Sequence, residues 1–402
     1  MSKKELNKVI LLLGVLSALG PFSIDMYLPG FPAIAKDLNV SIADVGLSLT
    51  SYFIGISVGQ LFYGPIIDRF GRKAPLLFGL SLYTVAAVIC ALAPTIHWLI
   101  ALRAVLALGG CAGMVAGRAI VRDLFPPADT AKVFSTLMLI MGVAPLIAPT
   151  MGGLIVASLG WRYIFAFLAV ISGLMLAAVY FFLPVSRQPD PSVTLRPAAV
   201  LREYWIVLTE PAFLNYAMAG GFAIGGLFAY VAGSPFIYMD LFHFTDTQYG
   251  WLFSFNALGY IAGSQFNRLC LRTSTTARIA ELSALSISII GFLMIAGVAT
   301  HSLPWIGFLT LLFLYLFALG FLTPNTSALT LEPITRNVGS ASAFMGFVQL
   351  IFGALASAMV SYLHNGTALP MAGVMAFCAI ASFTLLLVQK FKASGRNVEA
   401  AA

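Results

Sequence analysis

Two ionisable residues, Asp25 and Arg103, lie inside long apolar stretches of this sequence. Ionisable residues in an apolar solvent are rare and are most often functional. Dehydration disfavours the charged form of a carboxyl group and a nearby cation favours it, so a change of surroundings lets such a group bind and release a proton. The pattern predicts a proton-exchange site in which Arg103 competes with the proton, or with a cationic substrate, for the Asp25 carboxylate. The alternative is a neutralised pair that only locks two helices together.

The composition identifies the solvent around these residues. Hydrophobic residues make up 60% of the 402 residues and charged residues only 9%, whereas a soluble domain carries about 25% charged residues. A lipid bilayer must therefore surround most of the chain, and a helix that crosses it needs about 20 apolar residues. The sequence predicts an all-α polytopic membrane protein with twelve transmembrane helices. They lie near residues 8–30, 44–67, 74–93, 97–121, 132–157, 161–183, 211–231, 248–271, 277–299, 305–325, 338–363 and 368–391.

The basic residues give these helices a direction. If the N-terminus is cytoplasmic, nineteen of the 22 lysines and arginines fall in segments on the cytoplasmic side, as the positive-inside rule requires. Only Lys36 and Arg162 fall on the outer side. The pattern predicts a multi-pass protein with both termini in the cytoplasm. In this orientation Asp25 and Arg103 lie roughly 7 and 9 Å below the outer face, at nearly one depth.

The long hydrophilic segment between the sixth and seventh apolar stretches divides the chain. It predicts an N-terminal six-helix bundle (1–184), a cytoplasmic linker (185–210) and a C-terminal six-helix bundle (211–402). A faint repeat at a spacing of 199 residues supports a duplication. Its first copy is Gly64, Asp68, Arg69 and Arg72, and its second is Gly263, Asn267, Arg268 and Arg272.

Several other classes of protein do not fit the sequence. The four cysteines have no metal-ligand spacing, the four histidines map to short outer loops, and no pattern predicts a cofactor. No phosphate-binding loop indicates an ATP-driven pump, no clustered polar site indicates a membrane enzyme, and no basic patch indicates nucleic-acid binding. Helices broken by glycine and proline suit a transporter better than a channel. We expect a monomer whose partners are a small drug-like substrate, protons and the lipid bilayer.

The segment from Gly64 to Lys73 resembles the loop signature of the major facilitator superfamily between helices 2 and 3. It combines glycine, aspartate and three cations in a tight turn between two helix ends. In that family the loop latches the two bundles on the cytoplasmic side, and the alternative is an ordinary positive-inside loop. The resemblance predicts a cytoplasmic gate made of Gly64, Asp68, Arg69, Gly71, Arg72 and Arg122.

The fifth apolar stretch resembles the antiporter motif of the same superfamily. Its glycines and prolines would bend the helix and let a neighbour approach closely, and the alternative is a kinked packing helix. One departure from the motif is Ala148, which stands where glycine is common. The residues of the antiporter-motif helix are Gly142, Pro145, Pro149, Gly152 and Gly153.

The first and fourth stretches resemble the bicyclomycin and chloramphenicol resistance group, the Bcr/CflA drug:proton antiporters. The resemblance is carried by residues 24–32, 102–103, 109–114 and 118–123, with Leu106 in place of the group's usual glutamine. It implies a proton-driven exporter of small amphipathic compounds that works by alternating access in a bacterial inner membrane. The alternative is proton-coupled uptake or export of a small metabolite, such as an amino acid or a peptide, on the same scaffold.

A substrate cavity is expected near the midplane between the two bundles. Aromatic and amide side chains are the candidates to line it, although aromatic residues in membrane helices also face lipid or neighbouring helices. The candidates are Tyr27, Tyr52, Phe228, Tyr230, Tyr238, Asn256, Asn325 and Gln349. The sequence does not specify which compound binds there.

Overall fold

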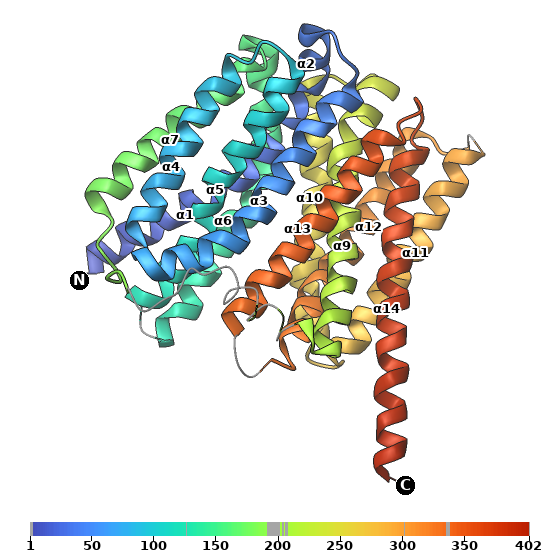
Figure 1. Cartoon of the computed structure of the whole chain (residues 1–402). Helices are drawn as coiled ribbons and strands as arrows, with labels where there is room; N and C mark the ends of the chain where they lie inside the picture. Colours follow the sequence, from blue (N-terminus) through green and yellow to red (C-terminus); the bar gives the residue numbers. More distant parts are fainter. Residues whose placement is uncertain are drawn as a thin grey trace. The chain divides into compact units, whose positions relative to one another are not determined.

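The computed structural model describes residues 3–125, 127–190, 202, 205, 208–300, 302–334 and 338–401. All regular structure in this part of the chain is helical, which confirms the all-α fold (Figure 1). The first half contains α1 (Lys3–Asp25), η1 (Leu28–Gly30), α2 (Phe31–Leu38), α3 (Ile42–Phe70), α4 (Lys73–Ala91), α5 (Ile96–Leu124), α6 (Pro127–Leu159) and α7 (Arg162–Phe182). The second half contains α9 (Pro211–Pro235), η2 (Phe236–Leu241), α10 (Asp246–Cys270), α11 (Thr276–Ala299), α12 (Trp305–Leu331), α13 (Val338–Tyr362) and α14 (Leu369–Ala401).

The long helices of the described residues fall on the twelve predicted spans. Eleven of the spans are long and apolar enough to cross a membrane, and α10 is the exception. Its sequence carries Asp246, Gln248, Asn256, Asn267 and Arg268, which lower its mean hydropathy. The twelve-helix prediction is therefore confirmed, with one span that is more polar than the others.

The chain forms two compact units. Unit 1 comprises Met1–Val200 and Tyr238–Ser254, and unit 2 comprises Leu201–Ile237 and Phe255–Ala402. In unit 1, α5 packs along α3 and α4, while α1 packs along α6. In unit 2, α9 packs along α13 and α14, and α11 packs along α12 and α14. The boundaries predicted at 184 and 210 stay a prediction, and most of the linker, including 191–201, lies outside the described residues.

The first span is broken into three pieces. The helix α1 ends at Asp25, a turn follows, and the short 3-10 helix η1 leads into α2. Pro29 explains the break, because it lacks the N–H group that would bond to the carbonyl of Asp25 in a continuing helix. The first helix of the second half, α9, is also interrupted: it ends at Pro235 and continues as the π-helix η2. The break and α2 position the residues of the candidate site.

Candidate functional site

Arg103 on α5 is completely buried beside the break in the first span. Its Nη1 atom donates a hydrogen bond of 2.8 Å to the backbone carbonyl of Ser23, in the last turn of α1. In a continuing helix that carbonyl would accept the N–H of Tyr27, which instead bonds to the carbonyl of Ile24. Arg103 thus satisfies a carbonyl that the break leaves free, and its positive charge lies at the negative end of the helix dipole.

Two tyrosine rings enclose the guanidinium group of Arg103. Its central carbon lies 4.4 Å from the ring centre of Tyr27 and 4.4 Å from that of Tyr52, and the ring of Phe165 is 5.9 Å away. Cation–π contacts of this kind stabilise a cation that has lost its water. The Nε and Nη2 atoms of Arg103 are buried and have no hydrogen-bond partner among the described residues.

The Asp25 carboxylate does not pair with Arg103 in this structure. Ser23 and Tyr27 are four residues apart and both contact Arg103, whereas Asp25 lies two positions from each, on the other side of the helix turn. Asp25 is 7% exposed, and the structure gives its carboxylate no hydrogen bond or ion pair with any described residue. Arg103 therefore lies beside the turn of α1 that carries Asp25, without forming the direct neutralised pair of the alternative interpretation. The equal depth of the two residues in the membrane stays a prediction.

Hydroxyl groups hold the residues around Arg103 in place. The hydroxyl groups of Tyr27 and Ser48 are hydrogen bonded at 2.7 Å. Ser23 donates to the carbonyl of Leu19 at 2.6 Å and its hydroxyl also contacts that of Tyr83. The rings of Tyr27 and Tyr52 are at most 1% exposed, and both contact the cation of Arg103. Their role in substrate binding stays a prediction.

The other cavity candidates lie in separate places. In unit 2, the amide of Asn256 donates to the hydroxyl of Tyr230 at 3.3 Å, and both are buried. The amide of Asn325 donates to Asn267 at 2.7 Å, and that of Gln349 reaches Ser327 at 3.4 Å. Phe228 is half-buried in α9, against α13 at Gly353. Tyr238 belongs to unit 1, where its ring lies 6.2 Å from that of Tyr249.

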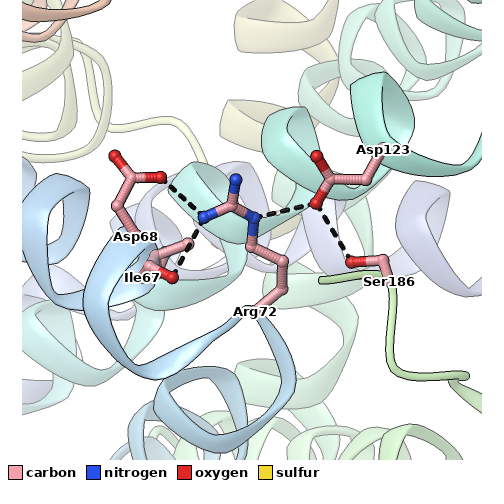
Figure 2. Close-up of polar contacts among 5 residues, drawn as sticks. All are labelled: Ile67, Asp68, Arg72, Asp123 and Ser186. Carbon is pink, nitrogen blue, oxygen red and sulfur yellow. Dashed lines mark hydrogen bonds and ion pairs between the residues drawn. The ribbon is translucent and has the colours of Figure 1, made fainter. Parts of the chain in front are cut away.

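The predicted gate loop centres on Arg72, as Figure 2 shows. Its Nε atom donates to Asp123 at 2.9 Å, and its Nη1 atom donates to Asp68 at 2.6 Å and to the carbonyl of Ile67 at 3.0 Å. Ser186 also donates to Asp123, at 3.2 Å. Burial lowers the pKa of Arg72, but the hydrogen bonds to Asp123 and Asp68 outweigh it and hold the pKa above its usual value. The structure thus joins the loop to the end of α5 and to the segment after α7.

The rest of the loop is consistent with a tight turn. Gly71 has φ +76°, and an added Cβ there would lie 2.8 Å from the carbonyl oxygen of Arg187. The carbonyl of Arg69 accepts the N–H of Asp190 at 3.0 Å. An added Cβ on Gly64 would have no neighbour within 4 Å, and the side chain of Arg122 lies outside the described residues. Asp123 and Ser186 were not predicted as gate residues, although Asp123 follows Arg122 in the sequence.

The antiporter-motif helix α6 touches two other elements through its glycines. An added Cβ on Gly152 would collide with the carbonyl of Met26, at the break in the first span, and one on Gly153 would lie 2.6 Å from the carbonyl of Asp246. Ser254 of α10 donates to the carbonyl of Leu146 at 2.7 Å. Gly142 has no such neighbour, while Pro145 and Pro149 interrupt the helical hydrogen bonds between these contacts.

Within the described residues, no group of three or more histidine, cysteine, aspartate or glutamate side chains could hold a metal ion. The predicted absence of a metal and of a cofactor is not tested by this observation. The candidate site is thus a buried carboxylate, a buried guanidinium group and a broken helix.

The sequence matches known proteins over nearly its whole length. The family model described as Major Facilitator Superfamily matches residues 13–358. The uncharacterized MFS-type transporter YdgK of Bacillus subtilis is 35% identical over 94% of both chains. A bicyclomycin resistance protein homolog of Haemophilus influenzae is 33% identical over 93% of this chain and 94% of that protein. The multidrug resistance protein MdtL of Escherichia coli is 29% identical over 94% of both chains.

Solved structures show the same fold. A bacterial homolog of the human lysosomal transporter Spinster, in an inward-facing and unoccupied conformation, has a TM-score of 0.74 at 13% identity, with 96% of both chains covered. A D-xylose–proton symporter has a TM-score of 0.71 at 16% identity and the same coverage. At these identities the likeness concerns the fold alone. The family match and the relatives show that this chain belongs to the Major Facilitator Superfamily, as a multi-pass membrane transport protein and not an enzyme.

Proposed function

We propose that this protein is a proton-driven exporter that exchanges small amphipathic compounds for protons by alternating access. The observation that carries the proposal is the Asp25 carboxylate, which is buried at a break in a membrane helix without a hydrogen-bond or ion-pair partner among the described residues. A carboxylate that keeps little contact with water and gains no partner in the protein is costly in its charged form, so a proton is the partner that such a group accepts most readily.

The place of Asp25 suits a group that changes its surroundings. Interrupted helices in corresponding positions of two halves are typical of binding sites in secondary transporters. Here the first helix of each half is interrupted, at Pro29 and at Pro235. A small movement of η1 or α2 would change the water around Asp25 without unfolding α1. The break therefore supplies the flexible point that proton loading and release require.

In this proposal Arg103 holds the broken end of α1 in place and does not itself carry the proton. It already donates to the Ser23 carbonyl and stacks between two tyrosines. It would compete for the carboxylate only after Asp25 turned toward it in another state of the cycle. The two predicted proton-coupling residues thus have different parts, with Asp25 as the carrier and Arg103 as the group that fixes the carrier's helix.

The names of the relatives support export of drug-like compounds. One relative is named for bicyclomycin resistance and another for multidrug resistance. One proton that crosses a potential of about 150 mV releases roughly 3.5 kcal/mol, and this is enough for a concentration ratio of several hundred. The distribution of lysine and arginine supports an orientation with both termini in the cytoplasm. The bacterial relatives support a place in a bacterial inner membrane, and we propose that the protein acts there as a monomer.

Proton release from inverted membrane vesicles tests the proposal. Vesicles are acidified inside, and bicyclomycin, chloramphenicol and a panel of lipophilic cations are added in turn. We expect wild-type vesicles to release protons with at least one compound and Asp25→Asn vesicles with none. The control is Glu332→Gln, which changes an exposed carboxylate at the end of α12, outside both interrupted helices, and should behave as wild type.

Two outcomes would contradict the proposal. If no compound releases protons from wild-type vesicles, antiport is wrong, and proton-coupled uptake of a metabolite becomes the leading function. If Asp25→Asn releases protons as fast as wild type, Asp25 is not the carrier, even though the protein is an antiporter.

A further inference from the structure

Three side chains form a cluster at the end of unit 1 where the first span breaks. The carboxylate of Asp37 on α2 accepts hydrogen bonds from Nη1 of Arg162 and, at 3.2 Å, from the indole N–H of Trp161. The guanidinium group of Arg162 lies 4.4 Å from the Trp161 ring centre and also donates to the carbonyl of Ala93 at 3.4 Å. We call Asp37, Trp161 and Arg162 the outer clasp.

The outer clasp joins three segments that are far apart in the sequence: α2, the turn between α4 and α5, and the start of α7. An isolated ion pair whose side chains are 41% and 43% exposed contributes little to stability. Here one carboxylate oxygen takes two donors, and Trp161 is only 4% exposed. The cluster is therefore a small hydrogen-bond network that is anchored by a buried side chain, Trp161. It has a defined geometry that a single surface ion pair lacks.

The outer clasp acts on the segment that carries Asp25. Only the turn and η1, whose three residues are all buried, separate Asp25 from α2. A Cβ added to Gly30 would lie 3.5 Å from Cβ of Trp161 and 3.3 Å from Cδ1 of Ile164. The break itself thus rests on the start of α7, and movement of Trp161 or α2 would reach it directly.

A column of rings continues inward from the outer clasp. The Trp161 ring centre lies 6.2 Å from that of Phe165, which lies 5.5 Å from that of Tyr27. Tyr27 in turn lies 4.4 Å from the guanidinium carbon of Arg103. Packed side chains of this kind are a physical route by which one end of a bundle affects a site inside it.

We propose that Asp37 and Arg162 are positioning residues that hold the broken first span closed over Asp25. The inference rests on the proposed function, because it concerns access to the carboxyl group proposed to carry the proton. Release of the outer clasp frees α2, loosens η1 and lets water reach Asp25. Neither residue touches the substrate or the transported proton.

The test measures how fast a water-soluble carbodiimide modifies Asp25 in the full-length protein in detergent at one pH, with the modified peptide assigned by mass spectrometry. Asp37→Asn and Arg162→Gln should each accelerate modification about threefold or more, because each opens the outer clasp. The two variants change the local charge in opposite directions. A purely electrostatic effect would therefore accelerate one and slow the other, and that result would overturn the proposal.

Three further proteins complete the test. The charge exchange Asp37→Arg with Arg162→Asp should return the rate to within about twofold of wild type, because it rebuilds the pair. Trp161→Phe keeps an aromatic ring at this position and removes the indole N–H donor, so it should accelerate modification less, in the same direction. Lys36→Gln changes an exposed neighbour on α2 and should have no effect.

Control measurements show whether a variant has lost its fold, and the modification assay is independent of the transport assay. Each variant is compared with wild type in gel filtration and thermal unfolding, and Trp161→Phe keeps the test decisive if the charge exchange does not fold. Unchanged modification in both single variants overturns the proposal. The modification assay uses no substrate, so its result remains valid even if the vesicles release no protons. Proton release by wild-type vesicles would likewise remain valid if the outer clasp had no effect on modification.

Discussion

Arg103 owes its place to properties that lysine lacks. A guanidinium group is planar, so it stacks between Tyr27 and Tyr52 while Nη1 donates to the Ser23 carbonyl. An ammonium group is not planar, so it cannot stack between the two rings while it donates to the Ser23 carbonyl. Arg103→Lys is therefore expected to destabilise the protein by about 1–3 kcal/mol, although the charge is kept. Thermal unfolding of the purified protein, followed by tryptophan fluorescence, measures the loss.

The matched control is Arg268→Lys, which alters an exposed arginine on α10 and should leave the unfolding temperature unchanged. Equal stability of Arg103→Lys and wild type would show that the charge alone matters at this position. The sequence predicted that Arg103 is buried and important, because an arginine in an apolar stretch is costly. It did not predict the partners, because residue type does not say whether a tyrosine faces a substrate, lipid or another side chain.

In the helix α6, replacing glycine by alanine adds one methyl group, and its effect should differ between a glycine in close contact with a neighbour and one without such a contact. An added Cβ on Gly152 would meet the carbonyl of Met26, whereas one on Gly142 would meet nothing within 4 Å. Gly152→Ala is expected to push α6 away from the break and to cost roughly 1–3 kcal/mol in stability. Gly142→Ala should be neutral or slightly stabilising, because alanine favours helix over glycine. Thermal unfolding of both variants checks this, and equal values would contradict the close contact.

The helical spans were predictable because hydropathy over about 20 residues reports directly on burial in lipid. Pro29, which causes the break, is visible in the sequence, but the predicted first span ended at residue 30 and α2 was not predicted. Hydropathy measures transfer into lipid and not the path of the backbone. The same limit hid the outer clasp, since Asp37 and Arg162 are 125 residues apart, with Asp37 in a segment expected to be a loop and Arg162 at the start of a predicted span.

At the scale of the whole molecule, the proposed coupling predicts that loss of the proton site abolishes one transport activity and spares another. Exchange of a labelled compound for an unlabelled one across the membrane moves no net proton. Accumulation against a gradient requires the proton, and the ratio of several hundred that it supports depends on the roughly 3.5 kcal/mol it releases at about 150 mV. A carrier that has lost only its proton site should therefore keep exchange and lose accumulation.

Asp25→Asn is expected to behave in this way in proteoliposomes. With radiolabelled chloramphenicol, or the first compound that releases protons from wild-type vesicles, the variant should exchange label at equilibrium at a rate similar to wild type. Under an imposed pH gradient the variant's accumulation ratio for the compound should fall to about one, because the asparagine side chain does not bind and release a proton. Accumulation that persists would show that another group carries the proton. Loss of both activities would show that Asp25 is needed to bind the compound or to change conformation, and the coupling role would then fall to a different residue.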